Sequence, residues 1–336
     1  MDLNRKAIAV SVVGVAVISL LIASVVGLFV PGRNGGNSKS PEVNKKKAVG
    51  IISIEGPIVC GSYTYTASAW SSEVSSDNIV SSLRSAADDP EIKAVVLRIN
   101  SPGGTAAGSQ EIGAEVDRFR KTGKSIVVSM ADVAASGAYL IACRADKILA
   151  NPGTMTGSIG VILEVSDYSG LYNKIGVSSR TFKSGPHKDM GSSNRTVTKD
   201  EHVLFQTMVD EIYGDFVNSV AAGRKMELEK VKLLADGRVF TGAQAKQVGL
   251  VDDLGNYRDA VALAGKLSGL GSEPRTVKLG PNKIWHELFG DSVSLSSFSG
   301  LIKQLTSNLS GNGIGGAQMQ QASPFPIILM LYQQNF

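Results

Sequence analysis

The chain has 336 residues, of which 43 % are hydrophobic and 19 % are charged. This composition excludes disorder of the whole chain, and the length suits one large domain or two small ones. The net charge is +4, and residues 1–47 hold seven Lys or Arg against two Asp or Glu. The remaining residues are therefore nearly neutral as a group, so the sequence predicts no nucleic-acid partner.

Residue types that bind metals are scarce in this chain. The cysteines are Cys60 and Cys143, and no CxxC or Cys/His cluster occurs. A structural zinc site is thereby excluded, whereas a disulfide and two free thiols both stay open. The histidines are His187, His202 and His286. We expect no metal and no cofactor.

The N-terminal region predicts a membrane anchor. Residues 1–6 form a short tail, and residues 7–30 carry no charge. As a helix, the uncharged segment would span about 36 Å, enough for a hydrocarbon core of about 30 Å. This segment is too long for the apolar part of a cleavable signal peptide. We expect a single transmembrane signal anchor in contact with lipid, followed by a flexible basic linker over residues 31–47.

Apolar runs and helical patterns alternate from residue 48 onward. We expect strands over residues 49–54, 93–100, 125–130, 147–150, 161–165 and 178–184, and helices over 77–87 and 108–122. A short helix is expected to begin near Ser136. This alternation predicts an α/β fold with layered helices and parallel strands.

A long helix and a C-terminal extension complete the expected organisation. Thr198 and Glu201 form a capping box that starts the helix. Its apolar residues recur at helical spacing and are expected to face the core: Val203, Leu204, Met208, Val209, Ile212, Phe216 and Val220. Residues 271–336 form the extension, with a helix expected over 296–309. The apolar run at residues 325–332 is too short to cross a bilayer.

A serine at a predicted sharp turn is the first candidate for chemistry. Ser136 follows the apolar run 125–130 and a stretch of small residues. Such residues let the backbone turn tightly and expose the hydroxyl at a helix start, where free N–H groups favour negative charge. The alternative is that Ser136 only caps the helix, which is the commoner role of a serine there.

Other candidates lie in glycine-rich turns and in one basic segment. In SPGG, residues 101–104, the N–H groups fit either an oxyanion hole or an ordinary turn. A serine nucleophile needs a base, and Lys183, His187 and Lys188 are close together in sequence. A lysine acts as a base only when burial keeps its amine neutral, and a solvated surface lysine is commoner. Ser158, in TGS, is typical of a turn on its own.

Five segments of the chain are informative when they are considered together and in their order. They are INSPGG (99–104), ADVAASGAY (131–139), NPGTMTGSIGVI (151–162), FKSGPHKD (182–189) and GRVFTGAQAKQVGLVDDLG (237–255). Together they resemble the bacterial signal peptide peptidase A family of membrane-anchored serine proteases, in its short single-domain form. The resemblance covers roughly residues 48–265. It implies a peptidase domain over residues 48–270 with the Clp-protease and crotonase fold, built from repeated ββα units.

The resemblance also implies roles for individual residues. Ser136 matches the nucleophile, Lys188 the general base, and Ser158 the hydroxyl that holds the lysine. The N–H groups of Gly137 and Gly104 match the oxyanion hole. The site so implied is a Ser/Lys dyad that needs no cofactor.

The same motifs contain positions without a catalytic role and two departures. Lys183 and His187 match motif positions that the family does not use in catalysis. Ala138 stands where the family often has a second glycine, and Leu140 where it often has tyrosine. These departures bear on substrate preference more than on the chemistry.

Assembly, location and substrate are likewise implied by the resemblance. Short members form a homo-oligomeric ring, here expected to be an octamer, in which the serine and lysine of one site come from neighbouring subunits. The expected location is the cell membrane, with a single span and the catalytic domain outside the cytoplasm. Charge counting alone favours the opposite orientation, because more basic residues follow the anchor than precede it. The implied substrates are apolar peptides such as cleaved signal peptides.

Two other functions remain as alternatives. An acyl-CoA enzyme of the crotonase type would share the fold without a serine nucleophile, but the anchor and the segment 182–189 disfavour it. A non-catalytic membrane scaffold would leave Ser136 as a cap and Lys188 solvated. The apolar run at residues 325–332 resembles a substrate, so it either docks in the protein's own substrate groove or packs on the body.

Overall fold

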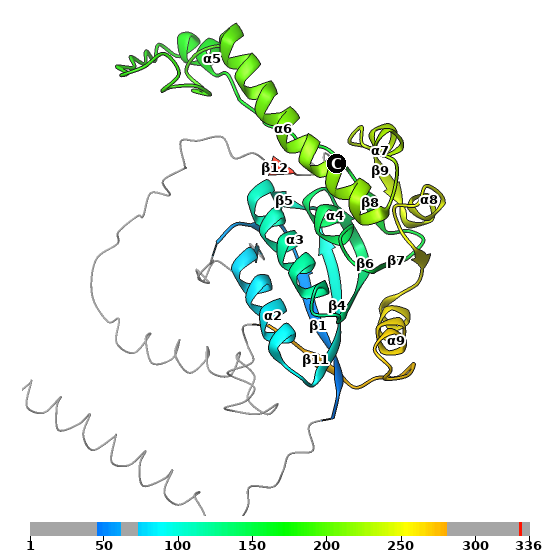
Figure 1. Cartoon of the computed structure of the whole chain (residues 1–336). Coiled ribbons are helices and arrows are strands. Elements are labelled where there is room, and N and C mark those ends of the chain that lie inside the picture. The colour runs from blue at the N-terminus through cyan, green and yellow to red at the C-terminus, as the bar shows by residue number, and fades with distance from the viewer. Residues whose placement is uncertain (1–45, 62–72, 281–328, 331–336) are drawn as a thin grey trace, which may run out of the picture. The chain divides into compact units, whose positions relative to one another are not determined.

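Figure 1 shows the computed structural model of the chain, which describes residues 46–61, 73–280 and 329–330. The predicted anchor at residues 7–30 and the predicted helix at 296–309 lie outside these residues. Within the described ranges, no helix combines the length and the apolar character that a membrane span requires.

A mainly parallel sheet forms the centre of the described region. Its strands are β1 (Ala48–Glu55), β4 (Ile92–Ser101), β6 (Ser125–Ala135), β7 (Lys147–Ala150), β8 (Met155–Gly157), β9 (Val239–Thr241), β10 (Asp253–Leu254) and β11 (Thr276–Lys278). The order is β10-β7-β6-β4-β1-β11, and β8 and β9 extend the sheet from β6. The pairs in this sheet are parallel except for β8 with β9. The α/β fold with parallel pairing is thus confirmed.

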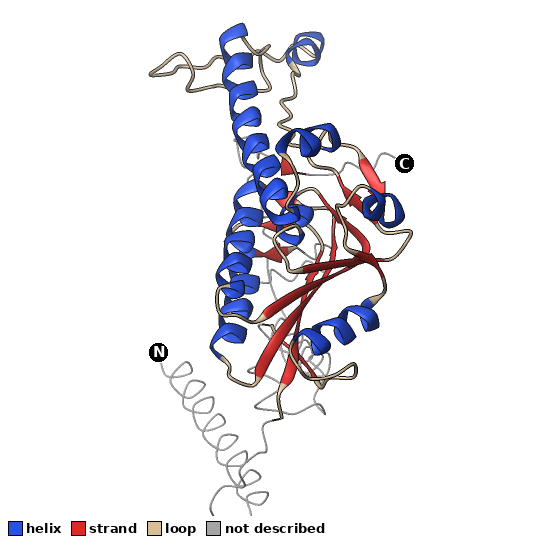
Figure 2. Cartoon of the chain, turned by 45° about the vertical axis from the view of Figure 1, so that its right-hand side comes forward, coloured by secondary structure: helices blue, strands red, loops and turns tan. Residues whose placement is uncertain are grey.

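Helices surround this sheet. They are α2 (Ser76–Asp88), α3 (Ala106–Arg120), α4 (Gly137–Ala142), α5 (Ser169–Lys174), α6 (Lys199–Arg224), α7 (Leu228–Leu234), α8 (Gly242–Gln247) and α9 (Tyr257–Leu267). Figures 1 and 2 show α2, α3 and α4 on one face of the sheet and α9 on the other. The strands of the sheet's centre are therefore covered on both sides, as parallel sheets usually are.

Side chains of the central strands alternate between two apolar cores. Ile52 and Leu97 lie in the larger core, beneath α2, α3 and α4. Ile51 and Val96, one residue earlier on the same strands, lie in the smaller core against α9. Each side chain is at most 5 % exposed, and burial of such a side chain contributes about 1.5–3 kcal/mol. The two-residue period explains why these strands read as continuous apolar runs.

Two of the predicted strands are absent. Within residues 161–165 only Ile162 forms an isolated bridge, and residues 178–184 are irregular. The second segment has strand-like residues, and Phe182 within it is 93 % exposed. A strand needs a neighbour for its backbone groups, and no described strand lies beside this segment. The strand predictions were therefore wrong here.

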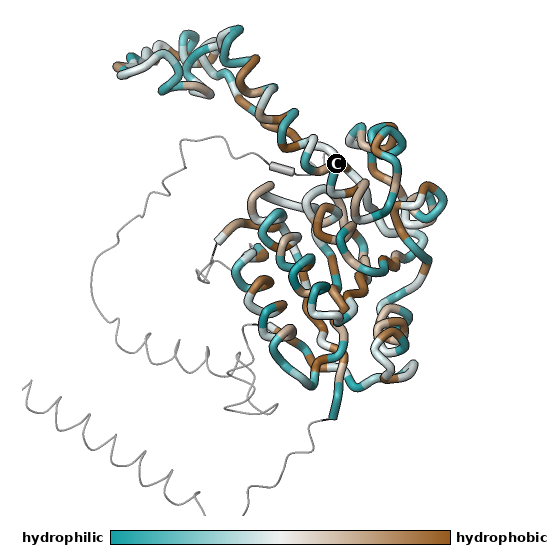
Figure 3. Tube along the Cα trace, viewed as in Figure 1, coloured by the Kyte–Doolittle hydropathy of each residue, from teal (hydrophilic) through white to brown (hydrophobic). Residues whose placement is uncertain are grey.

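Helix α6 is confirmed at its start and corrected in its burial. The Thr198 and Glu201 capping box is present. Phe216 and Val220 are buried, but Val203 is 64 % exposed, so the expected contact with the core holds only for the C-terminal half. Figure 3 shows apolar residues along the part of α6 that projects from the sheet. Helix α6 has 26 residues and is therefore about 39 Å long.

A second, small sheet lies beside the ends of the main strands. Its order is β12-β5-β2-β3, formed by β2 (Ile58–Val59), β3 (Val74–Ser75), β5 (Gly104–Thr105) and β12 (Leu329–Met330). The two residues of β12 come from the apolar C-terminal run and pair antiparallel with β5. Cys60, just after β2, and Cys143, just after α4, are both free thiols.

We predict that one glycine on α6 is required for packing. A Cβ at Gly223 would lie 2.1 Å from the carbonyl oxygen of Cys143. Gly223→Ala is therefore expected to lower the free energy of unfolding by about 1–3 kcal/mol. Chemical denaturation of the full chain in detergent measures this change.

The matched control lies on the same helix. A Cβ at Gly214 would meet nothing within 4 Å, so Gly214→Ala is expected to stabilise by about 0.5–1 kcal/mol. Equal effects of the two substitutions would contradict the close approach of α6 to Cys143.

Candidate active site

Ser136 occupies a strained backbone position between β6 and α4. Its φ is 53° and its ψ is −123°, a region that residues with a Cβ rarely adopt. A helix cap has an extended backbone, and Ser136 makes no side-chain cap hydrogen bond within the described residues. Ser75, by contrast, has φ −73° and accepts from the Asn78 N–H. The geometry of Ser136 is therefore that of a sharp turn between strand and helix, not that of a cap. Ser136 is only 2 % exposed, so the expected exposure of its hydroxyl is not found in the described chain.

The strained turn is held by the adjacent strand β8. The Ser136 N–H donates to the Gly157 carbonyl at 2.8 Å, continuing the β6–β8 pairing of Ala135 with Gly157. The next residue, Ser158, also has a positive φ of 49°, and its N–H donates to the Arg238 carbonyl at 2.9 Å. The structure thus brings two strained serines, Ser136 and Ser158, to the ends of neighbouring strands.

Gly104, the first residue of β5, lies beside the same turn. A Cβ at position 104 would lie 1.9 Å from the Ile58 carbonyl oxygen, so only glycine allows this approach of β2. A Cβ at Gly137 would lie 3.3 Å from the Gly104 nitrogen. Four predicted site residues, Ser136, Gly137, Gly104 and Ser158, therefore gather where parallel strands end, the edge where α/β proteins bind ligands.

The basic segment differs in how its two lysines are paired. The Lys183 ammonium donates to the Asp189 carboxylate at 2.7 Å and to the Pro186 carbonyl at 2.9 Å. Lys188 is exposed, and its ammonium has no hydrogen bond or ion pair among the residues that the structure describes. Lys183 is thus engaged in holding the loop, while Lys188 is available for another contact.

An arginine clamp fixes this loop to the start of α6. Arg195 donates to both carboxylate oxygens of Asp189, at 2.8 and 3.0 Å, and to both of Glu201, at 2.6 and 2.8 Å. These bonds lower the pKa of Glu201 to about 2, with a further contribution from the Thr198 N–H. The pKa of Asp189 is also lowered, by hydrogen bonds from Arg195 and then from Lys183. Bidentate pairs of this kind set orientation as well as charge.

The clamp places Lys188 away from Ser136 of the same chain. Glu201 lies in the first turn of α6, and Phe216, about 22 Å farther along the helix axis, is buried in the core. Figure 1 shows α5 and the loop before α6 projecting from the sheet. One described chain therefore does not bring Lys188, His187 or Lys183 to the serine turn.

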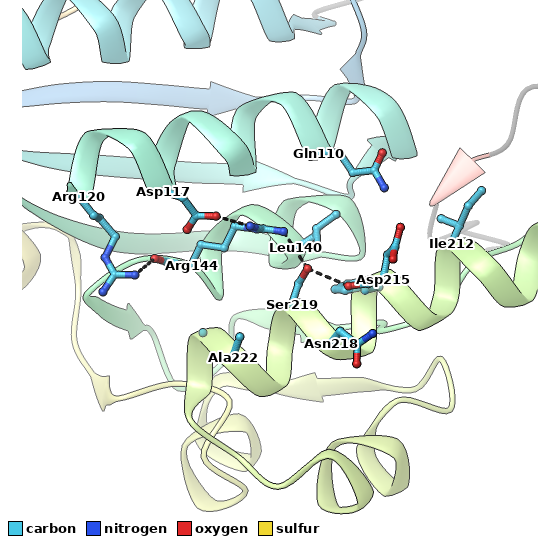
Figure 4. Close-up of a pocket in the computed structure, with 12 residues that line it drawn as sticks. Gln110, Asp117, Arg120, Leu140, Arg144, Ile212, Asp215, Asn218, Ser219 and Ala222 are labelled. Carbon is cyan, nitrogen blue, oxygen red and sulfur yellow. Dashed lines mark hydrogen bonds and ion pairs between the residues drawn. The ribbon is translucent and has the colours of Figure 1, made fainter. Parts of the chain in front are cut away.

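A pocket of about 470 Å³ lies elsewhere, between α3, α4 and α6 (Figure 4). Arg144 crosses it, paired with the Asp117 carboxylate and donating to the Ser219 hydroxyl at 2.7 Å. Arg120 donates to the Arg144 carbonyl at 2.9 Å. In this pocket the Ser219 hydroxyl donates to the backbone carbonyl of Asp215 at 2.8 Å, and the lining does not include Ser136. These contacts join three helices and indicate a structural role.

Comparison with known proteins identifies the chain's family. Residues 118–271 match the model of peptidase family S49. "Putative protease slr0021" of Synechocystis sp. is 45 % identical over 192 residues, which cover 57 % of this chain and 68 % of that protein. The chain belongs to peptidase family S49. It is a serine peptidase of that family, as the resemblance to signal peptide peptidase A predicted.

Other S49 relatives extend this finding. "Protease 4" of Salmonella typhi is 38 % identical over 222 residues, covering 66 % of this chain and 35 % of that protein. "Serine protease SPPA, chloroplastic" of Arabidopsis thaliana is 35 % identical over 194 residues, covering 57 % of this chain and 28 % of that protein. The chain thus spans about a third of these two relatives.

A solved structure gives a weaker likeness. A mutant of the 1510-N membrane-bound stomatin-specific protease has a TM-score of 0.43 and 14 % identity, and the match covers 70 % of this chain and 99 % of that chain. This score is too low to add to the S49 assignment.

Sequence reasoning missed the arginine clamp. Asp189 and Glu201 each lie six positions from Arg195 in sequence, a spacing that matches no helix or strand period. The only local signal was the capping box, which already used Glu201. Because the loop folds back on the start of α6, the clamp emerges from tertiary structure.

We predict that the backbone strain at Ser136 can be relieved by glycine. Ser136→Gly removes the Cβ that disfavours φ 53°, and is expected to raise the free energy of unfolding by about 1 kcal/mol. Ser136→Ala removes the hydroxyl but keeps the Cβ, so it should leave the stability nearly unchanged. Denaturation of the two variants beside the parent measures the difference, and a stabilising Ala with a neutral Gly would overturn this account.

We also predict a pH-dependent contribution of the clamp. Asp189 and Glu201 are more acidic when folded than when unfolded, so the contribution is complete above their ordinary pKa values and is lost as the pH falls toward 2. Arg195→Gln should therefore lower the Tm near pH 7, and the difference from the parent should shrink at low pH.

The control for this prediction is another arginine of the same region. Arg180 is exposed and has no ion pair among the described residues, so Arg180→Gln should leave the Tm unchanged at every pH. A Tm difference for Arg195→Gln that persists unchanged at pH 2 would contradict the electrostatic origin.

Proposed function

We propose that this S49 peptidase is a membrane-anchored serine endopeptidase with a Ser/Lys dyad, and that it degrades apolar peptides such as cleaved signal peptides. The observation that carries the proposal is the strained turn of Ser136, which excludes a capping geometry and sets the residue beside Gly137 and Gly104. A nucleophile held at a sharp turn next to backbone donors suits acyl transfer.

In the proposed mechanism, the neutral amine of Lys188 takes the proton of the Ser136 hydroxyl as the oxygen attacks a peptide carbonyl. The N–H groups of Gly137 and Gly104 donate to the oxyanion of the tetrahedral intermediate. Lys188 then returns the proton to the leaving amine as the peptide bond breaks. Lys188 then takes a proton from water as the water oxygen attacks the acyl carbon, and it returns that proton to the Ser136 oxygen as the acyl–oxygen bond breaks. Ser158 accepts a hydrogen bond from Lys188 and orients it.

The pairing of β12 with β5 supports an extended substrate. Leu329 pairs with Thr105 and Met330 with Gly104 in antiparallel register. A peptide strand can thus use the backbone of β5 and reach the donors beside Gly104, as in β-strand addition. The segment that does so here belongs to the apolar C-terminal run, so we propose that substrates bind in this mode and that the run competes with them.

The arrangement of α6 supports a site shared between subunits. Val203 and Phe182 are 64 % and 93 % exposed, and the same projecting region carries Lys188. Unpartnered apolar side chains favour association. We propose a homo-oligomeric ring of eight subunits, in which a neighbour's projecting region delivers Lys188 to Ser136. Enclosure between subunits would remove water from the amine and favour its neutral form.

The proposed location is the cell membrane, with residues 7–30 as the anchor in contact with lipid and the catalytic domain outside the cytoplasm. Residues 7–30 are long enough and uncharged. An anchor would hold the site near apolar peptides that remain in the bilayer.

Hydrolysis of a fluorogenic apolar peptide tests the dyad. The full chain in detergent is compared with Ser136→Ala, Lys188→Ala and Lys183→Ala, and the first two are expected to lose at least about 10³-fold in kcat. Lys183→Ala is the matched control, because this lysine pairs with Asp189, and it should keep most activity. Activity that survives Ser136→Ala would overturn the proposal.

Mixing two inactive variants tests the shared site. If serine and lysine come from neighbours, Ser136→Ala and Lys188→Ala subunits assembled together should recover roughly a quarter of the sites. Failure to recover any activity in verified mixed assemblies would place both residues of a site in one chain.

Removal of residues 323–336 should raise the rate of the parent if the C-terminal run competes with substrate.

A further inference from the structure

One buried hydroxyl beside the proposed oxyanion hole has no described partner. Ser109, in the first turns of α3, is 0 % exposed, and its Oγ makes no hydrogen bond within the residues that the structure describes. An unpaired buried hydroxyl costs about 1–3 kcal/mol. Such a group in a native fold calls for an explanation.

Other helix serines in this chain avoid that cost in the ordinary way. Ser82, Ser219 and Ser268 each donate to the carbonyl four residues earlier, at 2.7, 2.8 and 2.7 Å. The equivalent acceptor for Ser109 is the Thr105 carbonyl, and no such bond is made. The Ser109 hydroxyl is therefore directed elsewhere, although the usual local acceptor is within its sequence reach.

The direction of the hydroxyl leads to the serine turn. A Cβ at Gly137 would lie 2.3 Å from Ser109 Oγ and 3.3 Å from the Gly104 nitrogen. The hydroxyl is thus in contact with the Cα of Gly137, and glycine is required at that position for the contact to exist. Ser109, Gly104 and Gly137 converge on one point, next to Ser136.

We propose that the Ser109 hydroxyl is a third donor of the oxyanion hole, beside the N–H groups of Gly104 and Gly137. This inference rests on the proposed peptidase mechanism. As Ser136 Oγ bonds to the substrate carbonyl carbon, the carbonyl π electrons move to oxygen, and the Ser109 O–H donates to that oxyanion without transferring its proton. When the leaving amine departs, the carbonyl re-forms and the hydrogen bond is released.

This assignment explains why the hydroxyl is unpaired in the free protein. A donor that finds its partner only when charge develops stabilises the transition state more than the bound substrate. The unpaired hydroxyl lowers the stability of the free protein, whereas its hydrogen bond to the oxyanion stabilises the transition state. Removal of the hydroxyl should therefore act with opposite signs on stability and on kcat, which a purely structural serine would not do.

The test measures both quantities on the full chain in detergent. Ser109→Ala is expected to lower kcat by about 10²-fold with KM within about two-fold of the parent, while its Tm is equal to or above that of the parent. Ser82→Ala is the matched control, because this buried helix serine donates to Asn78, and it should leave kcat unchanged and lower the Tm. An unchanged kcat in Ser109→Ala would overturn the proposal, as would a kcat loss that accompanies a lower Tm.

A second measurement separates contact with the oxyanion from indirect effects. A peptide boronate forms a tetrahedral adduct with the nucleophile, whereas the matching peptide acid binds without one. Ser109→Ala should weaken the boronate by at least about ten-fold and leave the acid unchanged. Equal weakening of both ligands would overturn the role of Ser109. Failure of the peptidase proposal is recognised separately, because Ser136→Ala would then keep the parent's activity.

Discussion

The backbone of Ser136 depends on a neighbour that is far away in sequence. A residue with a Cβ does not hold φ 53° by itself, and here the hydrogen bond to Gly157 fixes the turn as the end of β6 meets β8. The residues of β6 that face α2, α3 and α4 are buried in the larger core, which fixes the position of that strand. The strained turn of Ser136 lies at the end of the β6–β8 pairing, with Gly104 and Ser109 packed against its next residue, Gly137. The geometry of the site is thus a product of the whole sheet.

Much of this fold could be predicted from sequence because its signals are local. Apolar runs with turns at both ends predicted β1, β4 and β7 to within one residue at each end, and the capping box at Thr198 predicted the start of α6. The start of β6 was also predicted, but the strand runs to Ala135, five residues beyond the expected end. The segment 178–184 failed because strand preference is conditional on a partner, and the described chain offers none there. The predicted burial of the apolar face of α6 failed for the same reason. Helical periodicity indicates that a face is apolar, but it does not identify the surface that covers that face.

For the site residues too, the sequence predicts what depends on neighbouring residues but not what depends on contacts in the folded chain. The small residues around Ser136 predicted a tight turn. The φ angle of Ser136 distinguishes a strained turn from a helix cap, and this angle is held by the hydrogen bond to β8. From sequence, the choice between Lys183 and Lys188 depends on the family resemblance. In the structure, the Lys183 ammonium donates to Asp189 and Pro186, whereas the Lys188 ammonium has no partner among the described residues. Nothing in the sequence indicated a role for Ser109, because only the structure shows that its buried hydroxyl has no described hydrogen-bond partner.

The length of α6 bears on how peptidase activity would depend on the concentration of subunits. Helix α6 has 26 residues, and apart from Glu201 its buried residues are Phe216, Val217 and Val220. The clamp at Arg195 holds the segment with Lys188 against the start of this helix, away from Ser136 of the same chain. Under the proposed assembly, a subunit that is newly made or isolated would be a latent enzyme, since it would hold a nucleophile without a base. Peptidase activity would then rise more steeply than protein concentration, so that the cell's supply of subunits would itself act as a safeguard against stray proteolysis.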